Sequence, residues 1–260
     1  MLHYEISGNG KKPLVLLHGF MEDHTIWSDM ESHFSKEFTL IKIDLPGHGK
    51  SENNNAVNSM DFMAEKVKEV IEKLNLNKIN ILGHSMGGYV SLAFAEKFPE
   101  SIESLTLFFS TTLADDEEKK QIRRRSIAVI DENFETFVNA SIPNLFSNNE
   151  KDILEGKIEL AKKIAKSTNK EGVKAAQLGM AERPERTEIL EKLEAKILII
   201  AGKYDNAVKT ENLLKALPDK TNIKTYVLDC GHCGHWEKPT ICAEIINTEL
   251  LHNLPKKLVF

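Results

Sequence analysis

The chain has 260 residues, of which 41% are hydrophobic and 28% charged, and its net charge is −5. This is ordinary globular composition, and it excludes a disordered chain and a coiled coil. The negative charge disfavours the tracking of phosphates, so we expect no nucleic acid partner. The N-terminus lacks a basic stretch followed by an apolar one, and no apolar run is long enough to span a bilayer. We expect a cytoplasmic monomer or homodimer that binds a small molecule.

Short apolar runs that alternate with helical patterns predict a mostly parallel sheet with helices on both faces, the α/β class. The runs are continuously apolar, which indicates strands buried on both faces. The segment Leu2–Ile6 is expected to add an antiparallel strand at the edge. The other predicted strands are Leu14–His18, Phe38–Ile43, Ile79–Leu82, Leu105–Phe109, Ile197–Ala201 and Lys224–Leu228.

Helical stretches lie between these strands. Apolar residues at steps of three and four run from Met60 to Leu74, with Ser59 as the expected N-cap. A second helix leaves the glycine pair Gly87-Gly88.

The alternation stops between about Thr111 and Ile189, where no strand-like run occurs. We interpret this stretch as a helical cap inserted late in the sheet, over the strand ends where open α/β sheets bind ligands. The predicted core is residues 1–110 and 190–260, and the predicted cap is residues 111–189. A separate helical domain is the alternative, which the return to the same sheet disfavours. The four helices predicted in this stretch are Asp115–Ile130, Phe134–Ile142, Lys151–Ser167 and Glu171–Met180.

The segment Gly83-His84-Ser85-Met86-Gly87 has the pattern Gly-x-Ser-x-Gly and lies between a predicted strand and a predicted helix. In that context the serine occupies a sharp turn, and the glycines leave room where a Cβ would collide with neighbouring backbone. The following helix directs free N–H groups toward the reacting oxygen. Ser85 is therefore the predicted nucleophile.

A serine hydroxyl needs a base, and the base needs an orienting carboxylate. In this architecture the chain order is serine, acid, histidine. His232 follows the last predicted strand and obeys this order; His235, three residues on, is a rival that we interpret as part of the surrounding loop. Asp205 lies in a glycine-containing turn after a buried strand and is the predicted acid, with Asp229 as the alternative.

Acyl transfer also needs N–H donors for the oxygen on which negative charge develops. His18-Gly19-Phe20 ends an early strand, so the N–H groups of Phe20 and Met86 are the candidate oxyanion hole. His18 itself is expected to fix the loop rather than to carry a proton. The other residues expected at the substrate site are Gly19, Arg124, Phe134, Phe137, Phe146, His235 and Trp236.

Two further motifs have alternative interpretations. The segment Asp44–Ser51 lacks the spacing of a phosphate-binding loop, and we interpret it as a rigid turn beneath the site. Cys230 and Cys233 have Cys-x-x-Cys spacing, but a redox or zinc role would need further ligands, so packing is the favoured interpretation. We expect no cofactor and no metal.

Together these motifs resemble the α/β-hydrolase superfamily along essentially the whole chain. The segment Gly179–Thr187 looks like the one that leads out of the cap in small carboxylesterases and enol-lactone hydrolases. The resemblance implies a Ser85–His232–Asp205 triad with an oxyanion hole at Phe20 and Met86. A serine at the elbow, where haloalkane dehalogenases carry aspartate, speaks against dehalogenation.

The predicted function is a carboxylesterase that cleaves small to medium esters through an acyl-enzyme. The alternatives are an enol-lactone or carbon–carbon bond hydrolase, a menaquinone-pathway-type lyase with the same triad, and a non-catalytic ligand receptor. One arginine of Arg123, Arg124 and Arg125 is a candidate for binding a substrate carboxylate, although self-paired charges on a solvated helix explain the run as well. The phenylalanines of this stretch either line an acyl pocket or only pack the cap on the core.

Overall fold

The computed structural model describes residues 1–251, and a single seven-stranded sheet forms its centre. The strand order is β1-β3-β2-β4-β5-β6-β7, with β1 antiparallel to β3 and every other neighbouring pair parallel. This arrangement confirms the predicted α/β class and the antiparallel edge strand. The strands are β1 (Tyr4–Ser7), β2 (Lys12–Leu17), β3 (Phe38–Ile43), β4 (Ile79–His84), β5 (Ile102–Phe108), β6 (Lys196–Gly202) and β7 (Ile223–Leu228).

Each predicted strand is present, but β7 differs from the expectation that all of them are buried on both faces. It forms the edge of the sheet opposite β1, and the side chain of Val227 is 46% exposed. An edge strand has a neighbour on one side only, so its outer surface meets solvent. The prediction of two-sided burial for Lys224–Leu228 was therefore wrong.

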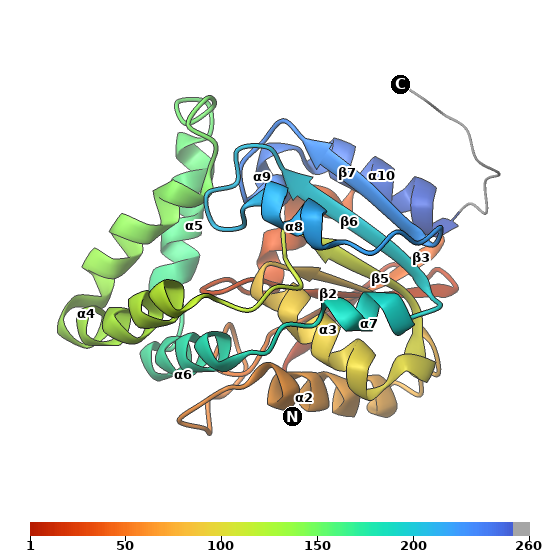
Figure 1. The fold of residues 1–260 in the computed structure, drawn as a ribbon, viewed down its shortest axis with the longest axis horizontal. Helices are drawn as coiled ribbons and strands as arrows, with labels where there is room; N and C mark the ends of the chain where they lie inside the picture. Colours follow the sequence, from red (N-terminus) through yellow and green to blue (C-terminus); the bar gives the residue numbers. More distant parts are fainter. Residues whose placement is uncertain (252–260) are drawn as a thin grey trace.

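Helices cover both faces of the sheet (Figure 1), which confirms the layered arrangement predicted from the sequence. Among residues 1–251, seven helices that we did not predict individually complete the core: η1, α1, η2, α7, α8, α9 and α10. Among residues 1–251, no helix is both long and apolar enough to cross a membrane. The helices are η1 (His24–Trp27), α1 (Ser28–Glu31), α2 (Met60–Lys73), α3 (Met86–Lys97), η2 (Pro99–Ser101), α4 (Glu117–Ser141), η3 (Ile142–Leu145), α5 (Glu155–Ser167), α6 (Lys170–Glu182), α7 (Thr187–Lys192), α8 (Thr210–Ala216), α9 (Gly234–Glu237) and α10 (Pro239–Leu251).

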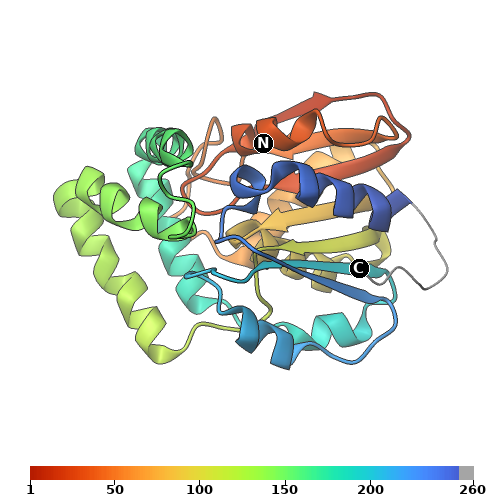
Figure 2. The ribbon, with the colours of Figure 1, turned by 90° about the horizontal axis from the view of Figure 1, so that it is seen from above.

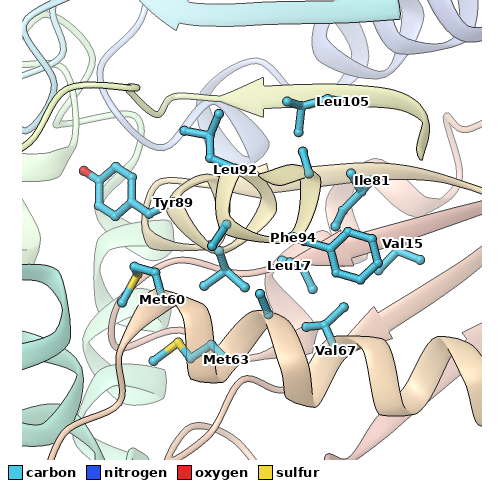
Figure 3. Packing of buried hydrophobic residues seen from close by; sticks show 14 of the residues in the cluster. Val15, Leu17, Met60, Met63, Val67, Ile81, Tyr89, Leu92, Phe94 and Leu105 are labelled. Atoms are coloured by element: carbon cyan, nitrogen blue, oxygen red, sulfur yellow. The ribbon is translucent and has the colours of Figure 1, made fainter. Parts of the chain in front are cut away.

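The alternation of side chains along β2 produces two hydrophobic clusters. Val15 and Leu17 point into the layer with α2 and α3, whereas Leu14 and Leu16 point into the layer with α1 and α10. Figure 3 shows the first of these layers, in which Val67 of α2 packs near residues of α3 and the sheet. Each large apolar side chain that is fully buried in this way stabilises the fold by about 1.5–3 kcal/mol.

The start of α2 is fixed by a side chain that precedes it in the sequence. The hydroxyl of Ser59 accepts a hydrogen bond from the backbone N–H of Phe62 at 3.1 Å, which confirms the expected N-cap of α2.

The predicted helical stretch between β5 and β6 contains α4, η3, α5 and α6, beside the end of the sheet toward which the β5 and β6 arrows point (Figures 1 and 2). The backbone of Asn133 is non-helical (φ −153°, ψ 90°), so α4 is two helices joined at a kink, near the predicted break. The last helix before β6, α7, packs against α3. The predicted boundary at residue 189 therefore divides a helix of the core layer, and residues 252–260 of the predicted core lie outside the described residues.

Candidate active site

Ser85 lies between the last residue of β4 and the first residue of α3, at a sharp turn. Its backbone has φ 50° and ψ −112°, a strained conformation that costs about 1–3 kcal/mol and persists only where the surroundings enforce it. The two flanking glycines are required by space. A Cβ on Gly83 would lie 2.2 Å from the carbonyl oxygen of Gly87, and a Cβ on Gly87 would lie 2.4 Å from that of Leu17.

His232 and Asp205 are joined by a short hydrogen bond after two neighbouring strands of the sheet. The Nδ1 of His232 lies 2.7 Å from Oδ2 of Asp205, and both side chains are almost fully buried. The other carboxylate oxygen, Oδ1, accepts the backbone N–H groups of Ala207 and Val208 at 2.8 Å each. An ionised carboxylate only accepts, so His232 carries its proton on Nδ1 and leaves Nε2 free to act as a base.

The alternative acid, Asp229, has a different environment. Its side chain is 72% exposed and forms a surface ion pair with Lys203. No hydrogen bond links it to a histidine among residues 1–251.

Ser85 and His232 line one cavity of about 580 Å³, at the carboxyl ends of the strands and beneath α4 and α6. Phe20 and Phe137, two of the predicted substrate residues, also line it. Within the described part of the chain, neither the N–H of Phe20 nor that of Met86 has a hydrogen-bond acceptor. Met86 is the first residue of α3, where N–H groups have no intrahelical partner.

His18 does not line the cavity, and both of its ring nitrogens bond to backbone. Nδ1 lies 2.7 Å from the carbonyl oxygen of Gly19, and Nε2 accepts the N–H of Leu45 at 2.9 Å. Complete burial lowers the pKa of His18, so the ring is neutral. These bonds are the ones expected of a loop-fixing histidine, and they leave neither ring nitrogen free for a substrate.

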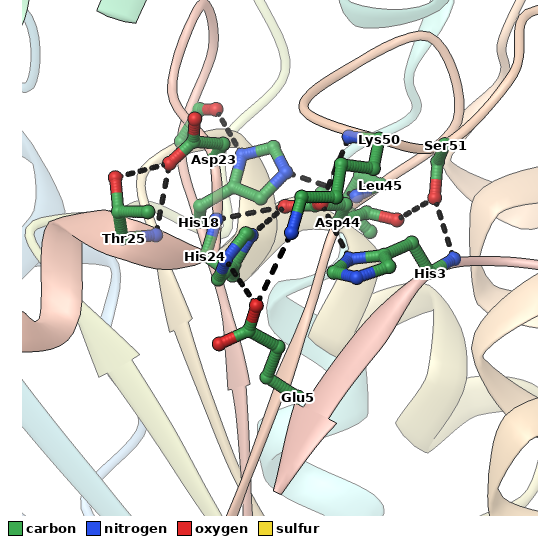
Figure 4. Close-up of polar contacts among 11 residues, drawn as sticks. His3, Glu5, His18, Asp23, His24, Thr25, Asp44, Leu45, Lys50 and Ser51 are labelled. Atoms are coloured by element: carbon green, nitrogen blue, oxygen red, sulfur yellow. Dashed lines mark hydrogen bonds and ion pairs between the residues drawn. The ribbon is translucent and has the colours of Figure 1, made fainter.

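The turn Asp44–Ser51 is fixed by the carboxylate of Asp44, which is surrounded by donors (Figure 4). It accepts hydrogen bonds from the backbone of His24 and Lys50, and both His3 and His24 place Nδ1 within 2.9 Å of it. Although burial alone opposes ionisation, these bonds hold the pKa of Asp44 well below its usual range. These bonds make the segment a rigid turn, and none of residues 44–51 lines the cavity.

The other predicted substrate residues lie elsewhere. Arg124 is exposed, because neighbouring residues on α4 point about 100° apart and it is Arg123 that faces the cavity. Phe134 packs against the hydrophobic cluster below α4, and Phe146 stacks on Trp236 with ring centroids 5.9 Å apart. His235 is completely buried. Phe134, Phe146, His235 and Trp236 thus pack around the site while Arg124 faces solvent, and none of these five predicted residues lines the cavity.

Three charged residues lie on the opposite wall of the cavity: Arg123, which was one of the three candidate arginines, and Asp115 and Arg183, which the sequence analysis missed. The carboxylate of Asp115 binds two guanidinium groups, that of Arg123 at 2.5 Å and that of Arg183 at 2.8 Å. Arg183 also stacks on the ring of Tyr89, 3.9 Å from its centroid. Although burial opposes ionisation, the hydrogen bond of Arg183 and the charge of Arg123 lower the pKa of Asp115 to about 2. Two guanidinium groups therefore share one carboxylate beside the cavity, and Nζ of Lys119 lies 3.7 Å from the same carboxylate.

The sequence held no clear signal for this group. Arg183 lies 68 residues from Asp115 in the chain, and a helix rich in paired charges, such as the one that holds Arg123, is normally solvated. Arg123 also bonds to Gln177 of α6 at 3.0 Å, which only the packing of α4 on α6 brings about.

The three cysteines are free thiols, buried in the hydrophobic layer with α10. Burial raises the pKa of each thiol, which keeps it protonated and unreactive. This environment agrees with a packing role.

Comparison with known proteins agrees with this geometry. The model of the alpha/beta hydrolase fold family matches residues 12–239. A thermophilic esterase from Thermogutta terrifontis is 32% identical, with a TM-score of 0.89 over 96% of this chain and 93% of that one. The enol-lactonase from Burkholderia xenovorans LB400 shares the fold, with a TM-score of 0.87 at 21% identity over 96% of both chains.

One curated relative aligns over most of both sequences. The 2-hydroxy-6-oxononadienedioate/2-hydroxy-6-oxononatrienedioate hydrolase of Escherichia coli K12 is 27% identical over 249 residues, which cover 91% of this chain and 86% of that protein. With the elbow, the sheet order and a family match over nearly its whole length, the chain belongs to the α/β-hydrolase fold family.

Proposed function

We propose that this protein is a serine hydrolase that cleaves small to medium carboxylic esters through an acyl-enzyme. The observation that carries the proposal is the buried Asp205–His232 hydrogen bond beside the strained Ser85, with Ser85 and His232 on one cavity wall. The 32% identity to an esterase over nearly the whole chain supports the same reaction class.

Each residue has a defined role in this reaction. Nε2 of His232 takes the proton of Ser85 as its Oγ attacks the ester carbonyl carbon, and the N–H groups of Phe20 and Met86 bind the resulting oxyanion. The imidazolium then protonates the leaving alcohol as the C–O bond breaks and the acyl-enzyme forms. Water, deprotonated by the same histidine, releases the acid and restores the hydroxyl of Ser85. Asp205 keeps the ring of His232 in the required tautomer throughout.

We further propose that the stretch from residue 111 to the start of α7 at Thr187 acts as a cap that selects the substrate. Residues of α4 and α6 line one side of the cavity, while the loops after the strands line the other. Apolar side chains from both sides, including Phe20, Phe137 and Met180, suit an aliphatic or aromatic acyl group.

A second candidate function is hydrolysis of a substrate that carries a carboxylate, such as an enol-lactone or a vinylogous diketone cleaved at a carbon–carbon bond. The Arg123–Asp115–Arg183 group favours it, because two guanidinium groups share one carboxylate there and a buried cation attracts an anion strongly. The E. coli relative is named for a dienedioate, which is a dicarboxylate.

The proposal is tested by labelling and by turnover. A fluorophosphonate probe is expected to label the wild-type protein at Ser85 and to leave Ser85→Ala unlabelled. A panel of p-nitrophenyl esters, lactones and carboxylated esters then ranks the two candidate functions. An unlabelled wild-type protein without turnover on the panel would favour a non-catalytic receptor and refute the proposal.

A further inference from the structure

We infer that a buried ion pair between Glu22 and His84 positions the reactive loops, and that protonation of His84 keeps them in place. This inference rests on the proposed function, because the loops that the pair joins are those that carry Phe20, Ser85 and His232. Neither residue has a part in the proton transfers described above.

Glu22 is 6% exposed and lies in the turn that follows β2. Its Oε2 accepts the backbone N–H of Gly19 at 2.6 Å and lies 2.8 Å from Nδ1 of His84. Gly19 immediately precedes Phe20, the proposed oxyanion donor. The carboxylate therefore holds the oxyanion loop directly.

His84 is the residue before Ser85, and its ring is 1% exposed. Its Nδ1 faces the carboxylate of Glu22, and its Nε2 lies 3.0 Å from the backbone carbonyl oxygen of His232. Both partners are acceptors, so both ring nitrogens must donate, and the ring is an imidazolium. Burial alone disfavours that charge, but the negative charge of Glu22 outweighs it and raises the pKa of His84.

The same interaction acts on Glu22. Burial alone disfavours its charge as well, but the charge and hydrogen bond of His84 lower the pKa of the Glu22 carboxyl to about 2. The N–H of Gly19 on the same oxygen further favours the ionised form. The pair is therefore a charged one, buried between three loops.

The space around the pair shows how closely the oxyanion loop rests on it. A Cβ on Gly19 would lie 2.7 Å from Oε2 of Glu22 and 2.7 Å from Nδ1 of His84. Glycine is thus the residue that lets the backbone next to Phe20 touch both members of the pair.

Other titratable groups face His84 from the segments after β6 and β7. The ring of His235 lies 4.6 Å from it and that of His232 lies 5.0 Å from it, centroid to centroid. His235 is completely buried, and burial together with the charge of His84 places its pKa well below the usual range, so it is neutral. Asp205 adds a further negative charge that favours the imidazolium. At a pH above the pKa of His84, the ring loses a proton and therefore one of the two hydrogen bonds that its nitrogens donate.

The loss of that bond has a mechanistic consequence. Reactive groups must be held within about 0.5 Å of their productive geometry, and His84 is bonded to the backbone of the base itself. Deprotonation of His84 therefore loosens either the His232 loop or the contact with Glu22, and it should set the alkaline limit of activity. The pair is a positioning device, with no contact to the reacting proton.

The test is Glu22→Gln, which keeps the size of the side chain and an oxygen for Gly19 but removes the charge. With p-nitrophenyl acetate we expect kcat at neutral pH to fall about tenfold or more and KM to change less than about threefold. Without its carboxylate partner the pKa of His84 falls, so the alkaline limb of the kcat profile is expected to move by at least about one unit to lower pH. A lower kcat with an unmoved alkaline limb would reduce Glu22 to a structural role and overturn the inference.

The matched control is Glu237→Gln. Glu237 is a buried carboxylate of the same region that binds the N–H groups of Gly231, Cys233 and Ser147. No histidine bonds to it among residues 1–251. Its neutralisation is expected to lower activity without moving the alkaline limb. An equal shift in both variants would contradict a specific role of the Glu22–His84 pair.

A spectroscopic measurement separates this inference from the proposed function. The ring ¹⁵N signals of His84, assigned from their absence in His84→Gln, should show two protonated nitrogens in the wild type at neutral pH and one in Glu22→Gln. A single protonated nitrogen in an active wild-type protein would overturn the inference alone. An inert wild type that resists the fluorophosphonate probe would instead refute the proposed function, whatever the state of His84.

Discussion

The loops at the carboxyl ends of the strands and the helical stretch α4–α6 are held together by different forces. In the loops, buried polar groups bond to backbone: Glu22, Asp205 and His84 each have partners at 3.0 Å or less. On the outside of the helical stretch, the charges are exposed, as in the pair between Lys166 of α5 and Glu135 of α4. Buried networks fix one geometry, whereas exposed ion pairs contribute little. The difference teaches that the loops around Ser85 are fixed by buried hydrogen bonds, while the outer face of α4–α6 is free to vary in sequence.

The largest loss of activity is expected from Ser85→Ala, in the loops at the strand ends. Ester hydrolysis is expected to fall by about three to six orders of magnitude, because the nucleophile is lost while the fold is kept. Steady-state turnover and the melting temperature check it. Ser167→Ala, at the end of α5, is the matched control, since its hydroxyl bonds only to the carbonyl oxygen of Ile164. A Ser85→Ala variant with wild-type turnover would remove the proposed mechanism.

The second largest loss of activity is expected from Asp205→Asn. We expect kcat to fall by about 10²–10⁴-fold, because the amide stabilises the wrong tautomer of His232. The control is Asp229→Asn on the same side of the sheet, which should leave kcat unchanged because its carboxylate is exposed. The reverse outcome, with Asp205→Asn benign, would identify Asp229 as the acid.

A smaller and more selective effect is expected from Arg123→Ala on the cavity wall. Turnover of neutral esters should stay within about twofold, while KM for a carboxylated ester should rise about tenfold, the range of one charge-assisted hydrogen bond. Arg124→Ala is the control, because its side chain is exposed. Equal effects on neutral and carboxylated esters would leave the plain carboxylesterase as the better assignment.

The smallest effect should come from Lys166→Ala, which removes the exposed ion pair with Glu135. We expect no measurable change in melting temperature or in kcat, since exposed pairs are screened by water and salt. A clear loss of thermal stability would show that the α4–α5 contact depends on this charge, contrary to the comparison drawn above.

The sequence by itself determined the fold class and predicted the candidate reaction centre. Continuous apolar runs between helical patterns specify a parallel sheet, and Gly83 and Gly87 flank a turn where backbone crowding forbids a Cβ. Ser85, Asp205 and His232 follow strand ends, and parallel strands bring their carboxyl ends to one edge of the sheet. Local patterns suffice here because strand, turn and helix each impose their own residue types.

Only the tertiary structure decided which polar residues meet. The rotation of α4 places Arg123 toward the cavity and Arg124 toward solvent, and it joins Asp115 to Arg183 across 68 residues of chain. Glu22 and His84 lie 62 positions apart and pair in the interior. Such contacts depend on the packing of distant segments, for which no periodicity or spacing exists in the sequence, because burial and charge pairing are set by three-dimensional neighbours.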